Sequence, residues 1–273
     1  MNYIDENVLI GQNVKLGDNV TIKAGCILED NIIIGDNVFV DCTTIIHSNV
    51  IIESDSTIGA RCILGEYVVD FYEDRVNKIH PLHIGRGSLI RSESIIYGDN
   101  DFGDYLQTGH RVTIREKSQI GEHVRIGTLS DIQGYCKIGN YVQMHSNVHI
   151  GQESVIKDYV MIFPYVVLTN DPYPPSRPLH GVTIEEFAVI CTGAVLLPGV
   201  IVKKDALVGA GAIVSKDVAS ENIAVGNPAK MVGNVTKILN KDTGEQVYPW
   251  RYSYGTGMPW AGIGYETWRS KKD

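Results

Sequence analysis

The chain has 273 residues, enough for one large domain, and its 24 Lys and Arg against 32 Asp and Glu give a net charge of −8. With no basic cluster, this balance argues against a nucleic-acid partner. No apolar run reaches the roughly 18 residues that cross a bilayer, and the first residues lack a basic leader, so we expect a cytoplasmic protein without a membrane segment. Five cysteines without a CxxC pair predict neither a disulfide framework nor a zinc knuckle, and we expect no metal.

The dominant pattern is an aliphatic residue at every sixth position. It runs from Ile4 to Leu64, resumes from Ile84 to Leu168, and resumes again from Ile184 to Val214. Of these 32 positions 31 are apolar, and Thr108 is the exception. Six is not a helical period but contains the period of two that a strand requires. Each hexad therefore predicts a short strand and a corner.

Three hexads make a triangular coil of about 18 residues, and such coils stack at about 4.8 Å through parallel backbone hydrogen bonds. The pattern predicts an all-β protein, a parallel β-helix of about ten to eleven coils over residues 1–230. Glycine follows the aliphatic residue in many hexads, as at Gly121 and Gly139, which predicts a bend that needs little side chain or a positive φ.

The register is interrupted twice, and interruptions of a solenoid usually protrude and carry function. We expect loops near residues 67–83 and 170–181, the second stiffened by prolines. Residues 231–273 form an irregular tail rich in Tyr and Trp. We expect this tail to pack on the base of the helix or on a neighbouring subunit.

Several segments resemble the hexapeptide-repeat acyltransferases. They are the repeat itself, the sequence Leu-Thr-Asn before a proline-rich loop, and the stretches 193–200, 208–214 and 225–230. The order Val-Leu-Thr-Asn-Asp, prolines, then Gly-Asn-Pro-Ala-Lys is most similar to N-acetyltransferases acting on nucleotide-linked amino sugars. The long N-terminal run and the aromatic tail resemble those members that modify dTDP-3-amino-3,6-dideoxyhexoses. The resemblance implies a left-handed helix, a homotrimer with active sites between subunits, and acetyl-CoA bound between coils.

The resemblance also implies catalytic residues. A catalytic His or Asn often occupies the hexad that here reads Met-His-Ser-Asn-Val-His, which makes His145 the first candidate and His149 the second. Sugar O-acetyltransferases of this fold carry a His before the loop proline, where this chain has Asn170 and Asp171. Asn cannot take a proton from a hydroxyl, whereas a neutral amine needs less help, so amino transfer is favoured. Asn170 then orients the amine, and Asp171 is a sugar ligand or a turn residue.

Because residues 18 apart lie above one another between residues 84 and 168, stacked columns can be derived from the sequence. These columns could hold a nucleotide-linked amino sugar lengthwise, with an arginine on the pyrophosphate. The candidate substrate-binding residues on them, or near them, are His110, His123, Arg91, Arg111 and Arg115.

For the donor, the resemblance implies binding of pantetheine by backbone groups and of phosphates by lysines. The residues concerned are Gly193, Ala194, Gly211, Ala212, Lys216 and Lys230. Cys191 is not expected to be a nucleophile, because no His or Asp is placed to activate it.

Three alternatives stay open. One is O-acetylation of a sugar, or acetylation of another small molecule, by the same fold. Another is a non-catalytic β-helix scaffold. The third is a zinc carbonic anhydrase of the same fold, which needs three convergent His across two subunits, and the His145/His149 spacing does not obviously supply them.

Overall fold

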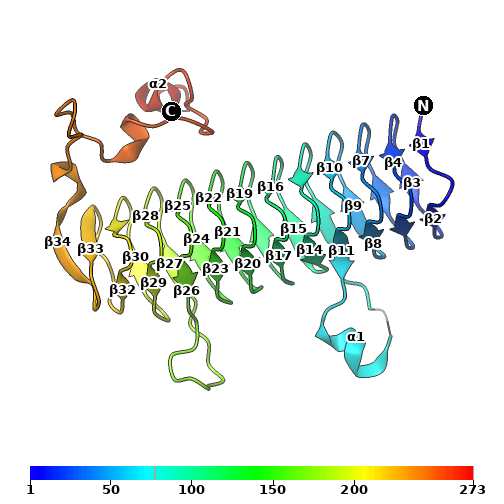
Figure 1. Cartoon of the computed structure of the whole chain (residues 1–273), viewed down its shortest axis with the longest axis horizontal. Coiled ribbons are helices and arrows are strands. Elements are labelled where there is room, and N and C mark those ends of the chain that lie inside the picture. Colours follow the sequence, from blue (N-terminus) through cyan, green and yellow to red (C-terminus); the bar gives the residue numbers. More distant parts are fainter. Residues whose placement is uncertain (77, 273) are drawn as a thin grey trace.

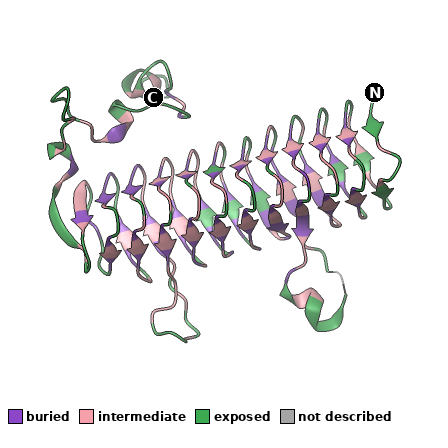
Figure 2. Ribbon diagram, viewed as in Figure 1, coloured by how far each residue is buried: buried purple, intermediate pink, exposed green. Residues whose placement is uncertain are grey.

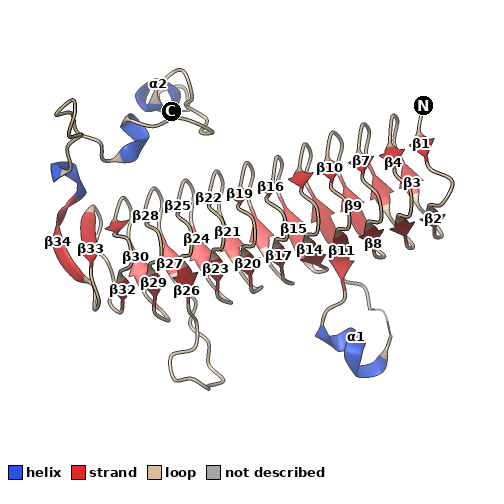
Figure 3. Ribbon diagram, in the orientation of Figure 1, coloured by secondary structure: helices blue, strands red, loops and turns tan. Residues whose placement is uncertain are grey.

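The computed structural model describes residues 1–76 and 78–272. The chain winds into a three-sided column in which each coil contributes one short strand to each of three parallel sheets, as Figures 1 and 3 show. The fold is a left-handed parallel β-helix. We name the sheets A, B and C in the order in which the chain visits them. The corners between them are AB, BC and CA.

Sheet A has 13 strands, and β34 at its end is antiparallel. They are β1 (Tyr3–Ile4), β4 (Thr21–Ile22), β7 (Phe39–Val40), β10 (Thr57–Ile58), β13 (Leu89–Ile90), β16 (Gln107–Thr108), β19 (Arg125–Ile126), β22 (Gln143–Met144), β25 (Met161–Ile162), β28 (Val189–Ile190), β31 (Leu207–Val208), β33 (Asn222–Val225) and β34 (Lys230–Asn234).

Sheet B has 11 strands and sheet C has 10. Sheet B contains β2 (Leu9–Ile10), β5 (Ile27–Leu28), β8 (Ile45–Ile46), β11 (Ile63–Glu66), β14 (Ile95–Tyr97), β17 (Thr113–Ile114), β20 (Asp131–Ile132), β23 (His149–Ile150), β26 (Val167–Leu168), β29 (Val195–Leu196) and β32 (Ile213–Val214). Sheet C contains β3 (Lys15–Leu16), β6 (Ile33–Ile34), β9 (Val50–Ile52), β12 (Leu82–Ile84), β15 (Asn100–Phe102), β18 (Gln119–Ile120), β21 (Lys137–Ile138), β24 (Val155–Ile156), β27 (Thr183–Ile184) and β30 (Ile201–Val202).

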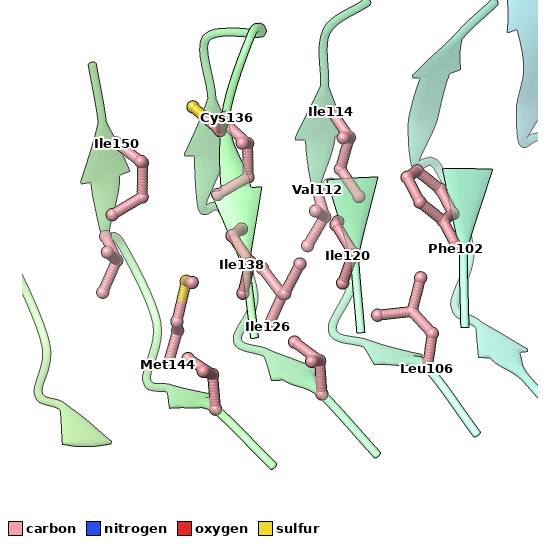
Figure 4. Close-up of a cluster of buried hydrophobic side chains, with 14 of the residues drawn as sticks. Phe102, Leu106, Val112, Ile114, Ile120, Ile126, Cys136, Ile138, Met144 and Ile150 are labelled. Atoms are coloured by element: carbon pink, nitrogen blue, oxygen red, sulfur yellow. The ribbon is translucent and has the colours of Figure 1, made fainter. Parts of the chain in front are cut away.

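The predicted register of 18 is confirmed where the hexads are continuous. Asp131 pairs with His149, and His149 pairs with Val167 on the next coil. Nearly all residues at every sixth position are buried and form one core. In Figure 2 the buried residues, in purple, recur along the column. In Figure 4, Ile120, Ile126, Ile138 and Met144 converge on the axis.

Three of these aliphatic residues are not buried, namely Ile4, Ile10 and the half-buried Leu16. Ile4 and Ile10 are 40% and 45% exposed, because the first coil has no neighbour beyond it. The polar exception Thr108 is buried at 2% exposure, and its Oγ1 accepts a hydrogen bond from the backbone N–H of Arg91 at 3.0 Å. A hydroxyl is therefore tolerated inside the column because it is hydrogen-bonded.

The glycines that follow the aliphatic positions serve close packing between coils. A Cβ on Gly121 would lie 2.4 Å from Asn140 Oδ1, and one on Gly139 would lie 2.3 Å from Asp158 Oδ1. The positive φ falls two residues later, usually on a residue other than glycine, as at His123 and Tyr141. Of the two reasons expected for glycine here, the small side chain is the one that applies.

Both loops leave the column at corner BC. The first lies between β11 and β12 and contains α1 (Val69–Asp74), and the second lies between β26 and β27. Figure 1 shows both projecting from the same edge of the column. Five steps of sheet B separate their starting strands, a distance of about 24 Å at 4.8 Å per coil.

After β34 the tail forms η1 (Val235–Lys237), η2 (Trp250–Tyr252) and α2 (Tyr265–Arg269) and runs back beside sheet A. Trp250 and Trp260 pack with Phe187 and Val189 in a second apolar cluster, and Trp250 Nε1 donates a hydrogen bond of 2.8 Å to the carbonyl of Phe187. Within the described residues, none of the helices has the length and apolar character needed to cross a membrane.

Candidate active site

The predicted site residues lie on different corners of the column. Corner AB carries Arg91, His110, Arg111, His145, Gly193, Ala194, Gly211 and Ala212. Corner BC carries Arg115, Asn170, Asp171 and Lys216. His123 lies at corner CA, and Lys230 lies on β34. Within one chain, sheet B therefore separates His145 from Asn170.

His145 is exposed and begins the turn after β22. Its ring stacks on Phe163 of the next coil, with the ring centroids 4.8 Å apart and the planes inclined by 15°. Both side chains line a cavity of about 510 Å³ between sheet A and the tail. The other lining residues are Gln143, Met161, Val189, Val247, Tyr248, Trp250, Ser253 and Tyr254.

His149 has a carboxylate partner that His145 lacks within the described residues. Asp131 Oδ2 lies 3.1 Å from His149 Nδ1 on the neighbouring strand and also accepts a hydrogen bond from Gln133. Partial burial would raise the pKa of Asp131, but the hydrogen bonds from His149 and Gln133 hold it below its usual value. The pair fixes the His149 ring with Nε2 turned away from the carboxylate, which is how a carboxylate orients an imidazole.

The loop after β26 contains no free proton acceptor at residues 170 and 171. The carboxylate of Asp171 accepts hydrogen bonds from Ser176 Oγ at 2.5 Å and from the backbone N–H groups of Ser176 and Tyr173 at 2.9 and 3.0 Å. These bonds, from Ser176 first, lower the pKa of Asp171. Asp171 therefore folds the loop, and Asn170 offers an amide.

The three arginines predicted to bind substrate differ in the side-chain contacts that they make. Arg111 Nε donates to Glu93 at 2.5 Å, and Arg61 binds the same carboxylate, so the two arginines lower the pKa of Glu93 to about 2. Arg115 pairs with the largely buried Glu116 and lies over the ring of Tyr97. Arg91 is exposed and has no side-chain partner among the described residues.

His123 is part of an aromatic stack along corner CA. Its ring lies between Tyr105 and Tyr141, with centroid distances of 4.6 Å on both sides. The stack continues through Tyr159 to Phe187. His123 thus lies at a different corner from His145, on the other side of sheet A, and its position fits a packing role.

The residues expected to bind the donor differ in exposure. Ala194 and Ala212 are fully buried and point into the core, so only their backbone can face a ligand. Gly193 and Gly211 have φ of +70° and +67°, and a Cβ at either position would meet nothing within 4 Å. His110 and the two lysines, Lys216 and Lys230, are exposed.

The thiols of Cys62, Cys136 and Cys191 are poorly suited to nucleophilic chemistry. Burial raises the pKa of Cys191, and it raises the pKa of both Cys62 and Cys136 to about 11. Across residues 1–76 and 78–272, no group of three or more His, Cys, Asp or Glu is arranged to hold a metal ion.

Two features were missed from the sequence. The first is the Asp131–His149 pair. These residues are 18 positions apart, so the predicted register could have placed them side by side. The second is the cavity beside His145. It could not have been predicted, because the tail residues that line it follow no periodic pattern that would place them against sheet A.

Comparison with known proteins finds the repeat and several relatives. Residues 7–42 match the family model "Bacterial transferase hexapeptide (six repeats)". A serine acetyltransferase of Bacillus pumilus is 34% identical over 132 residues, 48% of this chain and 60% of that protein. The mitochondrial gamma carbonic anhydrase 2 of Arabidopsis thaliana is 32% identical over 132 residues, 44% of this chain and 46% of that protein. The chain thus spans about half the length of these relatives.

Among solved structures, a mutant of perosamine N-acetyltransferase from Caulobacter crescentus, in complex with CoA and GDP-perosamine, has 24% sequence identity and a TM-score of 0.25. The match covers 52% of this chain and 57% of that one.

Proposed function

We propose that this protein is an acetyl-CoA-dependent N-acetyltransferase. Its acceptor is the amino group of a nucleotide-linked amino-deoxy sugar, with a dTDP-3-amino-3,6-dideoxyhexose as the expected example. The matched repeat and the serine acetyltransferase relative support acyl transfer. A cytoplasmic location is part of the proposal.

The choice of an amine as the acceptor rests on the side chains of Asn170 and Asp171, neither of which is placed to act as a base. A hydroxyl acceptor needs a base to remove its proton, whereas a neutral amine is already a nucleophile. Asn170 cannot act as a base, and the carboxylate of Asp171 is occupied by Ser176 and Tyr173. These two residues can orient an amine through Asn170, but they cannot activate an alcohol.

The reaction is a direct transfer. The amine nitrogen attacks the thioester carbon, the C–S bond breaks, and an amide and free CoA thiol are formed. The amine proton passes to His145 or directly to the departing thiolate, whose conjugate acid has a pKa of roughly 8.5 by analogy with Cys. A backbone N–H at corner AB, where Gly193 leaves open space, stabilises the oxyanion.

The site needs more than one chain. His145 and Asn170 lie at different corners, so both can contact one substrate only if corner AB of one subunit faces corner BC of another. A homotrimer with three equivalent sites between subunits satisfies this requirement.

The test is to offer nucleotide-linked 3-amino and 4-amino hexoses with acetyl-CoA and to follow thiol release. The matched control is the same nucleotide-linked sugar with a hydroxyl in place of the amine. We expect release with an amino sugar and at least about 100-fold less with the control. Release with the hydroxyl sugar alone would instead support O-acetylation. Failure to bind acetyl-CoA in calorimetry would leave the scaffold alternative.

The Arabidopsis relative favours carbonic anhydrase as a second candidate. In this chain His149 is held by Asp131, while His145 lies at the preceding corner beside Phe163. Metal analysis of the purified protein and a CO₂ hydration assay separate the two functions.

A further inference from the structure

The cavity beside His145 is larger and more apolar than an acetyl group requires. Its volume of about 510 Å³ falls within the range of about 300–1,000 Å³ that is usual for small-molecule pockets. Met161, Phe163 and Val189 form the wall on the β-helix, and the tail supplies Val247 and Trp250. Neither Asp, Glu, Lys nor Arg is among the residues that line it.

Two of the polar groups in the wall are already hydrogen-bonded within the protein. Trp250 Nε1 is bonded to the carbonyl of Phe187, and Ser253 Oγ is bonded to the carbonyls of Val247 and Trp250. Gln143 Nε2 is buried and has no partner among the described residues. A phosphate would lose its hydration here without a Lys or Arg to replace it, and most of the wall is apolar, so the cavity favours an uncharged and largely apolar group.

The cavity opens beside His145, the residue proposed to take the proton from the amine. His145 lies at the rim, and its ring stacks on Phe163 of the wall. Gly193, on the same corner, is two coils further along the column. A thioester held at corner AB near His145 therefore has its acyl carbon next to the mouth of an apolar pocket.

We propose that this cavity binds the acyl group of the donor and that it accepts acyl chains longer than acetyl. The inference rests on the proposed function, because it uses the same thioester and the same transfer to an amine. The bond changes are unchanged: the N–C bond forms, the C–S bond breaks, and the proton leaves the amine. The new element is a chain of about four to six carbons that lies between Phe163 and Trp250.

The experiment measures the dissociation constants of CoA, acetyl-CoA, butanoyl-CoA and hexanoyl-CoA with the full chain by calorimetry. Each buried methylene strengthens binding by about fourfold. Hexanoyl-CoA, four methylenes longer than acetyl-CoA, should therefore bind up to about 250-fold more tightly when all four methylenes are buried. Equal affinity of the two thioesters would overturn the proposal.

Two variants test the location of the pocket. Val247→Trp fills the cavity from the tail, and Met161→Phe fills it from sheet A, so each should reduce the hexanoyl-to-acetyl affinity ratio toward one. The matched control is Val232→Trp, because Val232 is an exposed valine of the same terminal region, on β34, outside the cavity. An unchanged ratio in both filled variants would place the acyl group elsewhere.

The outcomes separate this inference from the proposed function. Tight binding and turnover of acetyl-CoA without any gain from a longer chain would contradict only the acyl pocket. If none of the four compounds binds, both proposals fail.

Discussion

Asp131 and His149 face each other across neighbouring strands of sheet B, with 3.1 Å between Asp131 Oδ2 and His149 Nδ1. The pair lies on the outer side of the sheet between the two loops. Because the pKa of Asp131 is lowered in the folded protein, the pair stabilises the fold above the unfolded pKa of about 3.9. That contribution is lost as the pH falls through the lower, folded pKa.

We therefore expect Asp131→Asn to reduce the free energy of unfolding by about 1 kcal/mol at pH 7 and by much less at pH 3. Urea unfolding at the two pH values measures this. Lys137→Gln, a change of an exposed charge on sheet C, serves as the control. An equal loss at both pH values would show that the charge of Asp131 is not responsible.

His145 is the residue whose removal should affect turnover. If its imidazole takes the amine proton, His145→Ala lowers kcat by roughly 100-fold. The control is His83→Ala, because His83 is exposed on sheet C and contacts Asp101. A rate for His145→Ala within twofold of the unchanged protein would leave the thiolate as the proton acceptor, and Asn170 would be the next residue to replace.

His80 fixes the first loop through two carboxylates. Its Nδ1 lies 2.8 Å from Asp99 and its Nε2 lies 2.9 Å from Asp70 of α1, whose carboxylate also contacts Lys78. Burial would lower the pKa of His80, but the two carboxylates raise it. The stabilisation is complete below the unfolded pKa of about 6.5 and is lost as the pH rises through the folded pKa.

A neutral imidazole donates only one hydrogen bond, so one of the two contacts weakens at high pH. We expect amide hydrogen exchange in α1, corrected for intrinsic rates, to be faster at pH 9 than at pH 6. In His80→Gln this pH dependence should disappear, while His83→Gln keeps it. Exchange that does not respond to His80→Gln would assign the anchoring of α1 to other contacts.

Arg251 and Asp205 form a buried ion pair that joins the tail to the β-helix. Their side chains are 11% and 6% exposed, and the guanidinium also lies over the ring of Phe187. Arg251→Ala leaves the carboxylate buried and unpaired, which we expect to cost about 3–5 kcal/mol in urea unfolding. The double change Arg251→Met with Asp205→Leu should cost less than Arg251→Ala. A larger cost for the double variant would contradict the ion-pair explanation.

Ile33 and Ile34 are adjacent residues of β6 with opposite environments. Ile34 is 1% exposed, whereas Ile33 is 43% exposed on the outer face. Ile34→Ala should reduce the free energy of unfolding by about 2–5 kcal/mol, and Ile33→Ala by about 0.5 kcal/mol. Denaturant titration compares the two, and similar losses would mean that the inward register does not govern stability.

The sequence by itself determined the column. A residue such as Ile34 recurs at every sixth position, and the period of two within each hexad decides which side chain points inward, so strands, register, core and loop positions all follow. The stacking of Asp131 on His149 follows from the same spacing of 18.

Only the tertiary structure decided which side chains come together at the candidate site. Asp171 is a turn residue because Ser176 and Tyr173 reach its carboxylate, a contact that depends on how the loop folds. Trp250 lines the cavity beside His145 because its indole N–H donates a hydrogen bond to the carbonyl of Phe187, 63 residues away in the sequence. Such contacts arise from irregular segments that lack a period, so local patterns do not specify them, and only packing against the finished column brings them together.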